Sequence, residues 1–252
     1  MTLEATPPTR IQLCGPTVIE LAGERLEQHL PGRQGRLLFA YLVLKRHRPV
    51  GRDELIEAIW PEHRPSAADA GLNALISKLR KLLGTGVLDG RASLRLHLDK
   101  NALVDIEVAT EAVHRGESQV ALRDYKRAWG PSLAALFIAE REFLPGEDTP
   151  WIDEQRHTLA EIRLRALETY AAAALGTGGT ELPAAVRASR LLIRLVPLRE
   201  SGYQLLMQAL AAQGNVAEAL RVYTHLNDTL REELGVTPSA TTQAVYNELL
   251  RS

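Results

Sequence analysis

The chain has 252 residues, which at ~100–200 residues per domain corresponds to one large domain or two modest ones. Apolar residues make up 45%, enough for a core, but the longest apolar run, 37–44, is far shorter than the ~20 residues that cross a bilayer. Residues 1–10 contain no apolar stretch, so we expect no signal peptide and a cytoplasmic protein. Its one cysteine, Cys14, excludes an intramolecular disulfide and the usual cysteine-based metal sites.

The charge is uneven along the chain. Residues 1–100 carry 15 Lys and Arg against 11 Asp and Glu, a net charge of +4, whereas residues 101–252 carry 15 against 20, a net charge of −5. This asymmetry indicates a basic module, which could face an anion, followed by an acidic one. Because ordinary surfaces often show such an excess, the charge alone does not decide the function.

The beginning of the chain predicts strands followed by helices. A small antiparallel meander is predicted by three short segments. Apolar and other residues alternate at 11–14, β-favouring residues follow at 17–21, and the chain turns back after Gly23 into a third segment at 25–27. A helix is expected over 33–46, with a centre that is apolar on all sides and therefore buried. A second, short helix is expected over 52–60, with acidic residues in its first turn.

A third helix is expected over 66–83. Ser66 and Asp69 resemble a capping box at its start, and Gly84 follows at the position where glycine commonly ends a helix. Residues 87–98 then predict a hairpin that turns at Asp89-Gly90. We therefore expect a domain of 1–100 that mixes strands with helices.

The remainder, 101–252, is predicted to be a helical domain. Helices are expected over 106–115, 117–129, 151–175, 183–195, 200–213, 216–234 and 239–251. Gly116 is expected to turn the first pair, and the prolines make 130–150 irregular. The spacing of Tyr203, Leu206, Gly214, Ala219 and Tyr223 is that of a tetratricopeptide (TPR) hairpin, with a generic helical bundle as the alternative.

The third helix carries the pattern most informative for function. On a helical wheel, one arc forms a core stripe of Leu72, Leu75, Ile76, Leu79, Leu82 and Leu83. The opposite arc has a slim middle and no acid after Asp69, as a helix entering a DNA major groove requires. Its base-reading candidates are Asn73, Ala74 and Ser77. Its phosphate-binding candidates are Lys78, Arg80 and Lys81.

Three helices followed by a hairpin form the winged-helix arrangement, and the preceding strands specify the OmpR/PhoB type. Arginines at helix starts and in the hairpin complete the phosphate-binding set: Arg33, Arg52, Arg91 and Arg95. The fold class that we predict is an α+β winged helix-turn-helix N-terminal domain followed by an all-α TPR-like helical-repeat domain. An ordinary amphipathic surface helix remains the alternative for the third helix itself.

Motifs along most of the chain resemble the Streptomyces antibiotic regulatory protein (SARP) family. They include Leu30-Pro31-Gly32-Arg33-Gln34, Arg52-Asp53-Glu54-Leu55-Ile56, Ile59-Trp60, Pro197-Leu198-Arg199-Glu200 and Leu230-Arg231-Glu232-Glu233-Leu234-Gly235. The resemblance implies a winged helix joined to a TPR-like bacterial transcriptional activator domain. It also implies activation of genes, often for secondary metabolism, by binding repeats in double-stranded DNA near a promoter.

The resemblance further implies contact with RNA polymerase, through its sigma and other subunits. Pro61 to Pro65 correspond to the family's transactivation loop, so the polymerase-contact candidates are Glu62, His63 and Arg64. A homodimer on direct repeats is possible, and the expected location is the bacterial nucleoid in the cytoplasm. No catalytic constellation, metal site or cofactor motif is found, so we do not expect an enzyme. The alternative function is a protein-interaction or ligand-sensing adaptor whose winged helix no longer reads DNA.

Overall fold

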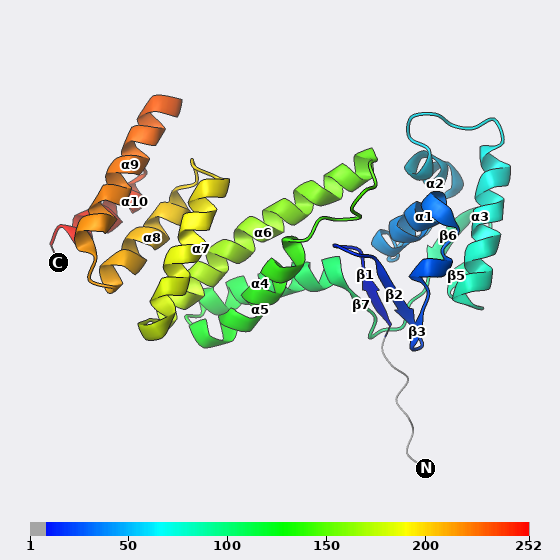
Figure 1. Cartoon of the computed structure of the whole chain (residues 1–252), viewed down its shortest axis with the longest axis horizontal. Coiled ribbons are helices and arrows are strands. Elements are labelled where there is room, and N and C mark those ends of the chain that lie inside the picture. Colours follow the sequence, from blue (N-terminus) through cyan, green and yellow to red (C-terminus); the bar gives the residue numbers. More distant parts are fainter. Residues whose placement is uncertain (1–8, 252) are drawn as a thin grey trace, which may run out of the picture. The chain divides into compact units, whose positions relative to one another are not determined.

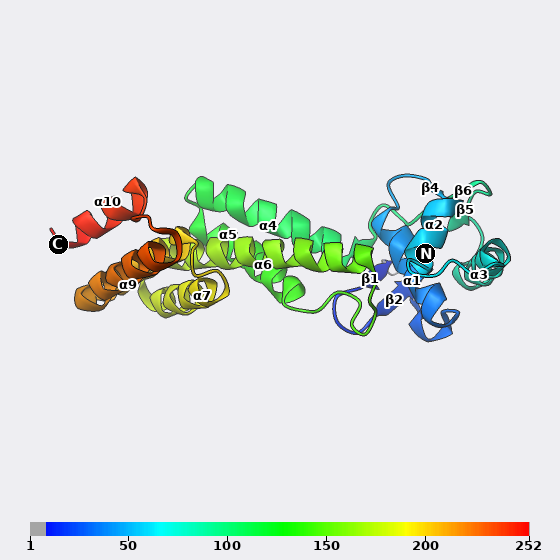
Figure 2. The ribbon, with the colours of Figure 1, turned by 90° about the horizontal axis from the view of Figure 1, so that it is seen from above.

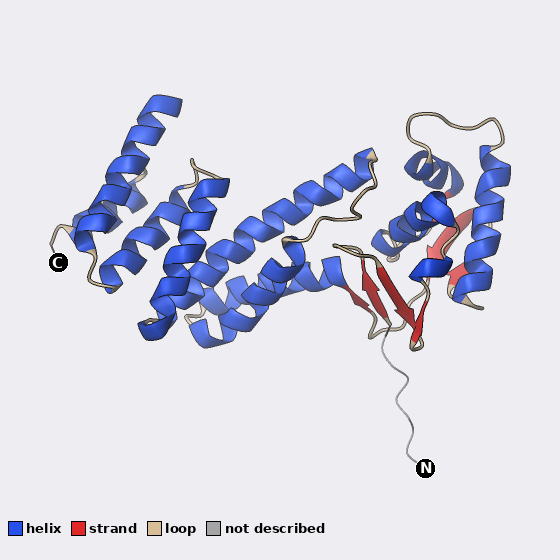
Figure 3. Ribbon diagram, in the orientation of Figure 1, coloured by secondary structure: helices blue, strands red, loops and turns tan. Residues whose placement is uncertain are grey.

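The computed structural model describes residues 9–251 (Figure 1). Most of 1–10, for which no signal peptide was expected, lies outside the described residues. The chain forms two compact units, one of residues up to Glu107 with Arg141–Thr158, and one of Val108–Glu140 with the residues from Leu159 onward. The strands of the described residues all belong to the first unit, shown in red in Figure 3.

The first unit opens with the expected meander. Strands β1 (Arg10–Gln12), β2 (Val18–Leu21) and β3 (Glu24–Arg25) pair antiparallel in sequence order. A strand that we did not expect, β7 (Leu103–Val104), pairs parallel with β1, so the sheet order is β3-β2-β1-β7. A strand of two residues carries almost no alternation, which is why the sequence pattern does not reveal it.

The winged helix follows the meander. After the 3-10 turn η1 come the three helices and a second sheet, in the order β4-β6-β5. The bounds are η1 Glu27–His29, α1 Gly32–Leu44, β4 Val50–Gly51, α2 Arg52–Ile59, α3 Ala68–Leu83, β5 Leu88–Asp89 and β6 Ser93–Leu96. Helix α1 is buried from Leu37 to Val43 and packs against α2 and α3. The predicted winged helix is confirmed, and we call the β5–β6 hairpin the wing.

The predicted capping box of α3 is wrong. The residue that caps α3 is Ala67, which contributes no side-chain hydrogen bond. Ser66 instead lies in a turn in which the Ala68 amide donates to the Pro65 carbonyl at 3.0 Å. The preceding turn therefore displaces the start of the helix by two residues from the position that Ser66 indicated.

The second unit is helical, and its hairpins pack in sequence order. Helices α4 and α6 begin in the first unit, α7 packs on α8, α8 packs on α9, and α10 packs on both α8 and α9. The bounds are α4 Asp105–Ala121, α5 Tyr125–Ala139, α6 Pro150–Thr177, η2 Gly179–Glu181, α7 Leu182–Leu195, α8 Glu200–Ala212, α9 Val216–Leu234 and α10 Ala240–Leu249. In the α8–α9 hairpin, buried Tyr203 packs with Leu226 and Leu230. The TPR-like fold is confirmed.

The expected turn at Gly116 is wrong, because α4 continues through it. A Cβ atom on Gly116 would lie 2.8 Å from Ser132 Oγ and 3.2 Å from Thr169 Cγ2, so the glycine permits close packing of α4 against α5 and α6. The turn comes at Arg123, whose φ is +58°. Pro131 lies inside α5 and does not begin an irregular segment. Figure 2 shows α4 alongside α6, where Arg165 also bonds a residue of α4.

Close packing at Gly116 predicts a position-specific loss of stability. Gly116→Leu is expected to lower the free energy of unfolding by about 2 kcal/mol or more, because Ser132 is fully buried and cannot yield space. Gly130 in α5 is the matched control, since nothing lies within 4 Å of a Cβ atom there. Gly130→Leu should be neutral or stabilising by up to ~1 kcal/mol, because leucine is the better helix former. Urea denaturation of both variants measures the difference, and equal losses would contradict the packing argument.

The compact units do not divide at the expected residue 100. Asp105 accepts hydrogen bonds from the amides of Leu13 (3.0 Å) and Cys14 (2.8 Å), and Cys14 forms a β-bridge with Phe143. Trp151 Nε1 donates to the Ala58 carbonyl at 3.0 Å. Residues from beyond position 100 thus complete the first unit. Burial raises the pKa of the Cys14 thiol.

No helix within residues 9–251 combines the length and the apolar character needed to cross a membrane.

Candidate nucleic-acid interface

Helix α3 divides into a buried and an exposed face, as the wheel predicted. Leu72, Ile76, Leu79 and Leu83 are buried, while Leu75 and Leu82 are half-buried at the border of the stripe. The residues of the opposite face are all exposed: Ala70, Asn73, Ala74, Ser77, Lys78, Arg80 and Lys81. The core stripe anchors α3 to α1 and α2, so the exposed face is presented on a rigid element.

The exposed face of α3 borders a hollow of about 360 Å³, which we call the α3–wing hollow. It is lined by residues of α2, α3 and the wing: Arg52, Asn73, Ile76, Ser77, Arg80, Gly90, Arg91 and Leu94. Five candidates from the sequence therefore meet in one place, and three of them are arginines. No acidic residue lines the hollow. Such a surface favours an anionic partner.

Three more of the cationic candidates lie on α3 and the wing, outside the hollow. Lys78 and Lys81 are exposed on α3, and Arg95 is exposed on β6, where its neighbours Leu94 and Leu96 are buried. None of these three cations has an ion-pair partner among residues 9–251. Their uncompensated charges suit the phosphate-binding role expected of them.

Arg80 has a structural role that the sequence did not reveal. Its Nε donates to the Leu88 carbonyl at 3.1 Å, and its Nη2 donates to the Gly90 carbonyl. Gly90 has a φ of +98°, and a Cβ atom there would collide with the Ser93 carbonyl, so the wing requires glycine at its turn. Arg80 thereby joins α3 to the wing while its charge stays at the hollow.

Arg33 lies apart from the other candidates. Its Nε is 2.7 Å from Glu147 Oε2, and Arg36 Nη2 is 2.9 Å from Glu147 Oε1. Arg33 therefore helps to hold segment 141–158 on the first unit, and its charge is compensated there. Because this partner lies more than a hundred residues away, the sequence pattern could not indicate it.

Arg52 and the loop between α2 and α3 belong to one chain of polar contacts. Arg52 Nη2 donates to Asn73 Oδ1 at 2.9 Å and lies 3.7 Å from Asp69 Oδ1. Asp69 Oδ2 is in turn 3.5 Å from Arg64 Nη2, and Arg64 Nη1 is 3.4 Å from Asp53 Oδ1. The Asp69 carboxylate at the start of α3 thus lies within ion-pair distance of two arginines, Arg52 at one oxygen and Arg64 at the other.

The loop Pro61–Pro65 is exposed throughout. Its three polymerase-contact candidates differ in their surroundings. Arg64 is tied to the starts of α2 and α3, whereas Glu62 and His63 have no ion-pair partner among residues 9–251. Glu62 and His63 are therefore the loop side chains available to a partner.

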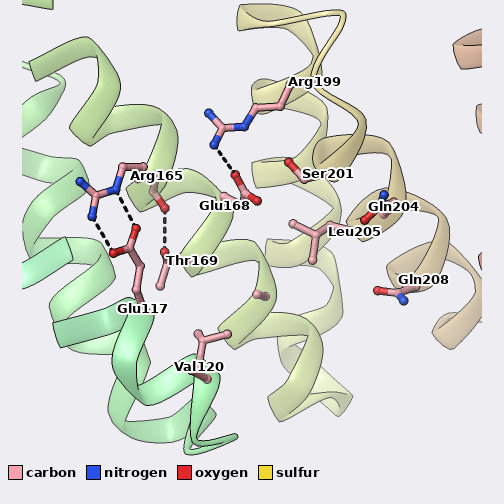
Figure 4. Close-up of a pocket in the computed structure, with 12 residues that line it drawn as sticks. Glu117, Val120, Arg165, Glu168, Thr169, Arg199, Ser201, Gln204, Leu205 and Gln208 are labelled. Carbon is pink, nitrogen blue, oxygen red and sulfur yellow. Dashed lines mark hydrogen bonds and ion pairs between the residues drawn. The ribbon is translucent and has the colours of Figure 1, made fainter. Parts of the chain in front are cut away.

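The second unit has a groove of different character, with a volume of about 570 Å³ (Figure 4). Arg165 donates twice to Glu117, at 2.7 and 2.6 Å, and Arg199 lies 2.9 Å from Glu168. The hydrogen bond from Arg165 keeps the pKa of Glu117 below its usual range. The charges of this groove compensate one another within it, so it lacks the cationic excess of the α3–wing hollow.

No group of three or more His, Cys, Asp or Glu side chains that could hold a metal ion occurs among the described residues.

Comparison with known proteins identifies the family. The family described as "Bacterial transcriptional activator domain" matches residues 104–250, and the family "Transcriptional regulatory protein, C terminal" matches residues 27–91. "Regulatory protein AfsR" of Streptomyces coelicolor is 34% identical over 99% of this chain. "Transcriptional regulatory protein EmbR" of Mycobacterium tuberculosis is 29% identical over 95% of this chain.

The solved structure of Mycobacterium tuberculosis EmbR in complex with a low affinity phosphopeptide is similar to this chain, with a TM-score of 0.81 at 28% identity. The match covers 96% of this chain and 65% of that one. The chain spans about a quarter of the length of the AfsR protein and 62% of the EmbR protein. With an activator domain over more than half of its length and a winged helix before it, the chain belongs to the Streptomyces antibiotic regulatory protein family of transcriptional activators.

Proposed function

We propose that this chain is a sequence-specific DNA-binding activator of transcription, for a secondary-metabolite or other pathway gene cluster, acting on nucleoid DNA in the cytoplasm. The observation that carries the proposal is the exposed face of α3 with the α3–wing hollow beside it. A slim row of Asn73, Ala74 and Ser77 is flanked by cations and closed on one side by the wing. Small and polar side chains admit a helix into the major groove, and the cations hold the phosphates on either side.

Two single substitutions separate base reading from phosphate binding. Asn73→Ala is expected to cost ~1–3 kcal/mol on the cognate site and little on random DNA, because it removes a hydrogen bond to a base edge. Lys81→Ala should weaken cognate and random DNA about equally and lower the salt slope by about one unit. Fluorescence anisotropy titrations at several salt concentrations measure both effects. Equal behaviour of the two variants would contradict the division of roles.

We further propose that the loop Pro61–Pro65 contacts RNA polymerase, through sigma and other subunits, while two copies of the chain occupy direct repeats near a promoter. Exposed Glu62 and His63 support this contact, since nothing within residues 9–251 pairs with them. Glu62→Ala combined with His63→Ala should reduce transcription in vitro and leave the DNA footprint intact. Arg64→Ala is the comparison variant, because it removes the ion-pair partner of Asp53 and Asp69 and leaves Glu62 and His63 in place.

The outcome of that experiment also tests the adaptor alternative. Equal loss of transcription and footprint would make the loop part of the DNA interface. A chain that binds no DNA and shows no salt-dependent association would instead favour a protein-interaction or ligand-sensing adaptor.

A further inference from the structure

The side-chain amide of Asn73 is oriented by a hydrogen bond from Arg52. Arg52 Nη2 lies 2.9 Å from Asn73 Oδ1, in a pair that joins the first residue of α2 to the exposed face of α3. A guanidinium group carries only donors, so the partner atom on Asn73 must be the carbonyl oxygen and not the amide nitrogen. The contact therefore turns the Asn73 oxygen toward Arg52 and the Asn73 nitrogen, with its two donors, away from it.

This orientation changes what Asn73 can read. An unrestrained asparagine pairs with adenine twice, donating to N7 and accepting from the N6 amino group. With its oxygen held by Arg52, the Arg52–Asn73 pair offers mainly donors to the groove. Guanine carries two acceptors on its major-groove edge, N7 and O6, and no donor there. A donor edge therefore fits guanine better than adenine.

The surroundings of Arg52 distinguish it from the phosphate-binding candidates. It lines the α3–wing hollow, its side chain is only 26% exposed, and Asp69 Oδ1 lies 3.7 Å from its Nη2. Lys81 and Arg91, by contrast, are exposed and have no ion-pair partner among the described residues. Part of the Arg52 charge is compensated, and its donor is already directed at a base-reading side chain.

We propose that Arg52 is a positioning residue that sets the base preference of Asn73, favouring guanine over adenine at the base pair that Asn73 contacts. Arg52 acts through Asn73, in place of the phosphate contact that its position at a helix start suggested. This inference rests on the proposed function, because it requires α3 to lie in the major groove.

The test begins with the complete chain and a binding-site selection from random duplex DNA. Asn73→Ala identifies the contacted base pair as the one at which discrimination is lost. The affinity of the wild-type chain is then measured with each of the four base pairs at that position. The site with guanine should bind about tenfold more tightly than the site with adenine, because both purines carry the N7 acceptor and only guanine carries a second acceptor, O6, in place of the N6 amino group.

Arg52→Met keeps much of the side-chain length and removes the donors. It should free Asn73 Oδ1 to pair with adenine and reduce or reverse the tenfold preference for guanine. Arg91→Met is the matched control, because Arg91 lines the same hollow without contacting Asn73. It should weaken all four sequences equally and lower the salt slope by about one unit.

These measurements separate the role of Arg52 from DNA binding itself. If Arg52→Met lowered the affinity for all four sequences equally and kept the preference for guanine, Arg52 would be a phosphate contact. That result would overturn the inference, while the DNA-binding function would stand. A wild-type preference for adenine would also overturn it. If the selection with wild-type chain returned no specific sequence, the proposed function itself would fail, and the inference with it.

Discussion

Replacing Ala74 with glutamate is expected to abolish sequence-specific DNA binding without unfolding the protein. Ala74 lies at the middle of the exposed face of α3, between Asn73 and Ser77, where the backbone of α3 must approach the floor of the groove. A glutamate adds both bulk and a negative charge next to the phosphates. The core stripe lies on the opposite side of the helix, so the loss should appear in binding and not in the thermal unfolding curve.

The matched control for Ala74→Glu is Ala134→Glu, which places the same side chain at an exposed position of α5 in the second unit. This variant should bind DNA like the wild type. If Ala74→Glu still protected the same DNA in a footprint, α3 would not lie in the groove, and the adaptor alternative would gain support.

A fragment that ends at Lys100 is expected to fail to fold. It lacks β7, and it lacks the Asp105 carboxylate that accepts from the amides of Leu13 and Cys14. It also lacks Phe143, which is fully buried and forms a β-bridge with Cys14. Each buried amide left without a partner costs about 1–3 kcal/mol, while a whole domain is stable by only about 5–15 kcal/mol.

Circular dichroism and thermal unfolding of two fragments measure this dependence. A fragment that ends at Thr158 retains the residues of the first unit and should unfold cooperatively and bind DNA. The fragment that ends at Lys100 should show no cooperative transition. Cooperative unfolding of the shorter fragment would mean that the winged helix folds without the residues beyond 100, and that residues 141–158 are not needed for its stability.

The regular parts of the fold could be predicted because their patterns are local. The leucine stripe of α3 specifies one buried face, and the run from Leu37 to Leu44 specifies a central helix. Helix α9 has the bounds that its periodicity indicated, with Gly235 in the left-handed conformation at its end. The local spacing of apolar residues is sufficient to predict a helix that is long and amphipathic.

Two of the misses, at Gly116 and at β7, come from contacts between residues far apart in sequence. Gly116 carries the signal of a turn, but its meaning depends on Ser132 and Thr169, which approach it only in the folded unit. Strand β7 exists because β1 offers it a partner more than ninety residues earlier. A pattern read over a short stretch of sequence cannot indicate such distant packing or pairing partners.

The sequence predicted which residues form the candidate interface more completely than it predicted what each of them does there. Asn73, Ser77, Arg52, Arg80 and Arg91 meet in one hollow, as their positions on α3, α2 and the wing indicated. The sequence did not indicate that Arg80 holds the wing, that Arg33 pairs with a distant carboxylate, or that Arg52 directs Asn73. Arginine serves all of these purposes with the same donors, so its role follows from its partner and not from its identity.

DNA reading by α3 is tested most directly by a footprint of the purified chain on the DNA upstream of its own coding sequence, repeated over a series of salt concentrations. Protection of discrete repeated sites is expected, with an affinity that falls steeply as salt rises, because several cations displace counterions from phosphates. Protection should be lost with Ala74→Glu. The absence of protection at low salt, or protection that is unaffected by Ala74→Glu, would contradict the claim that α3 reads DNA.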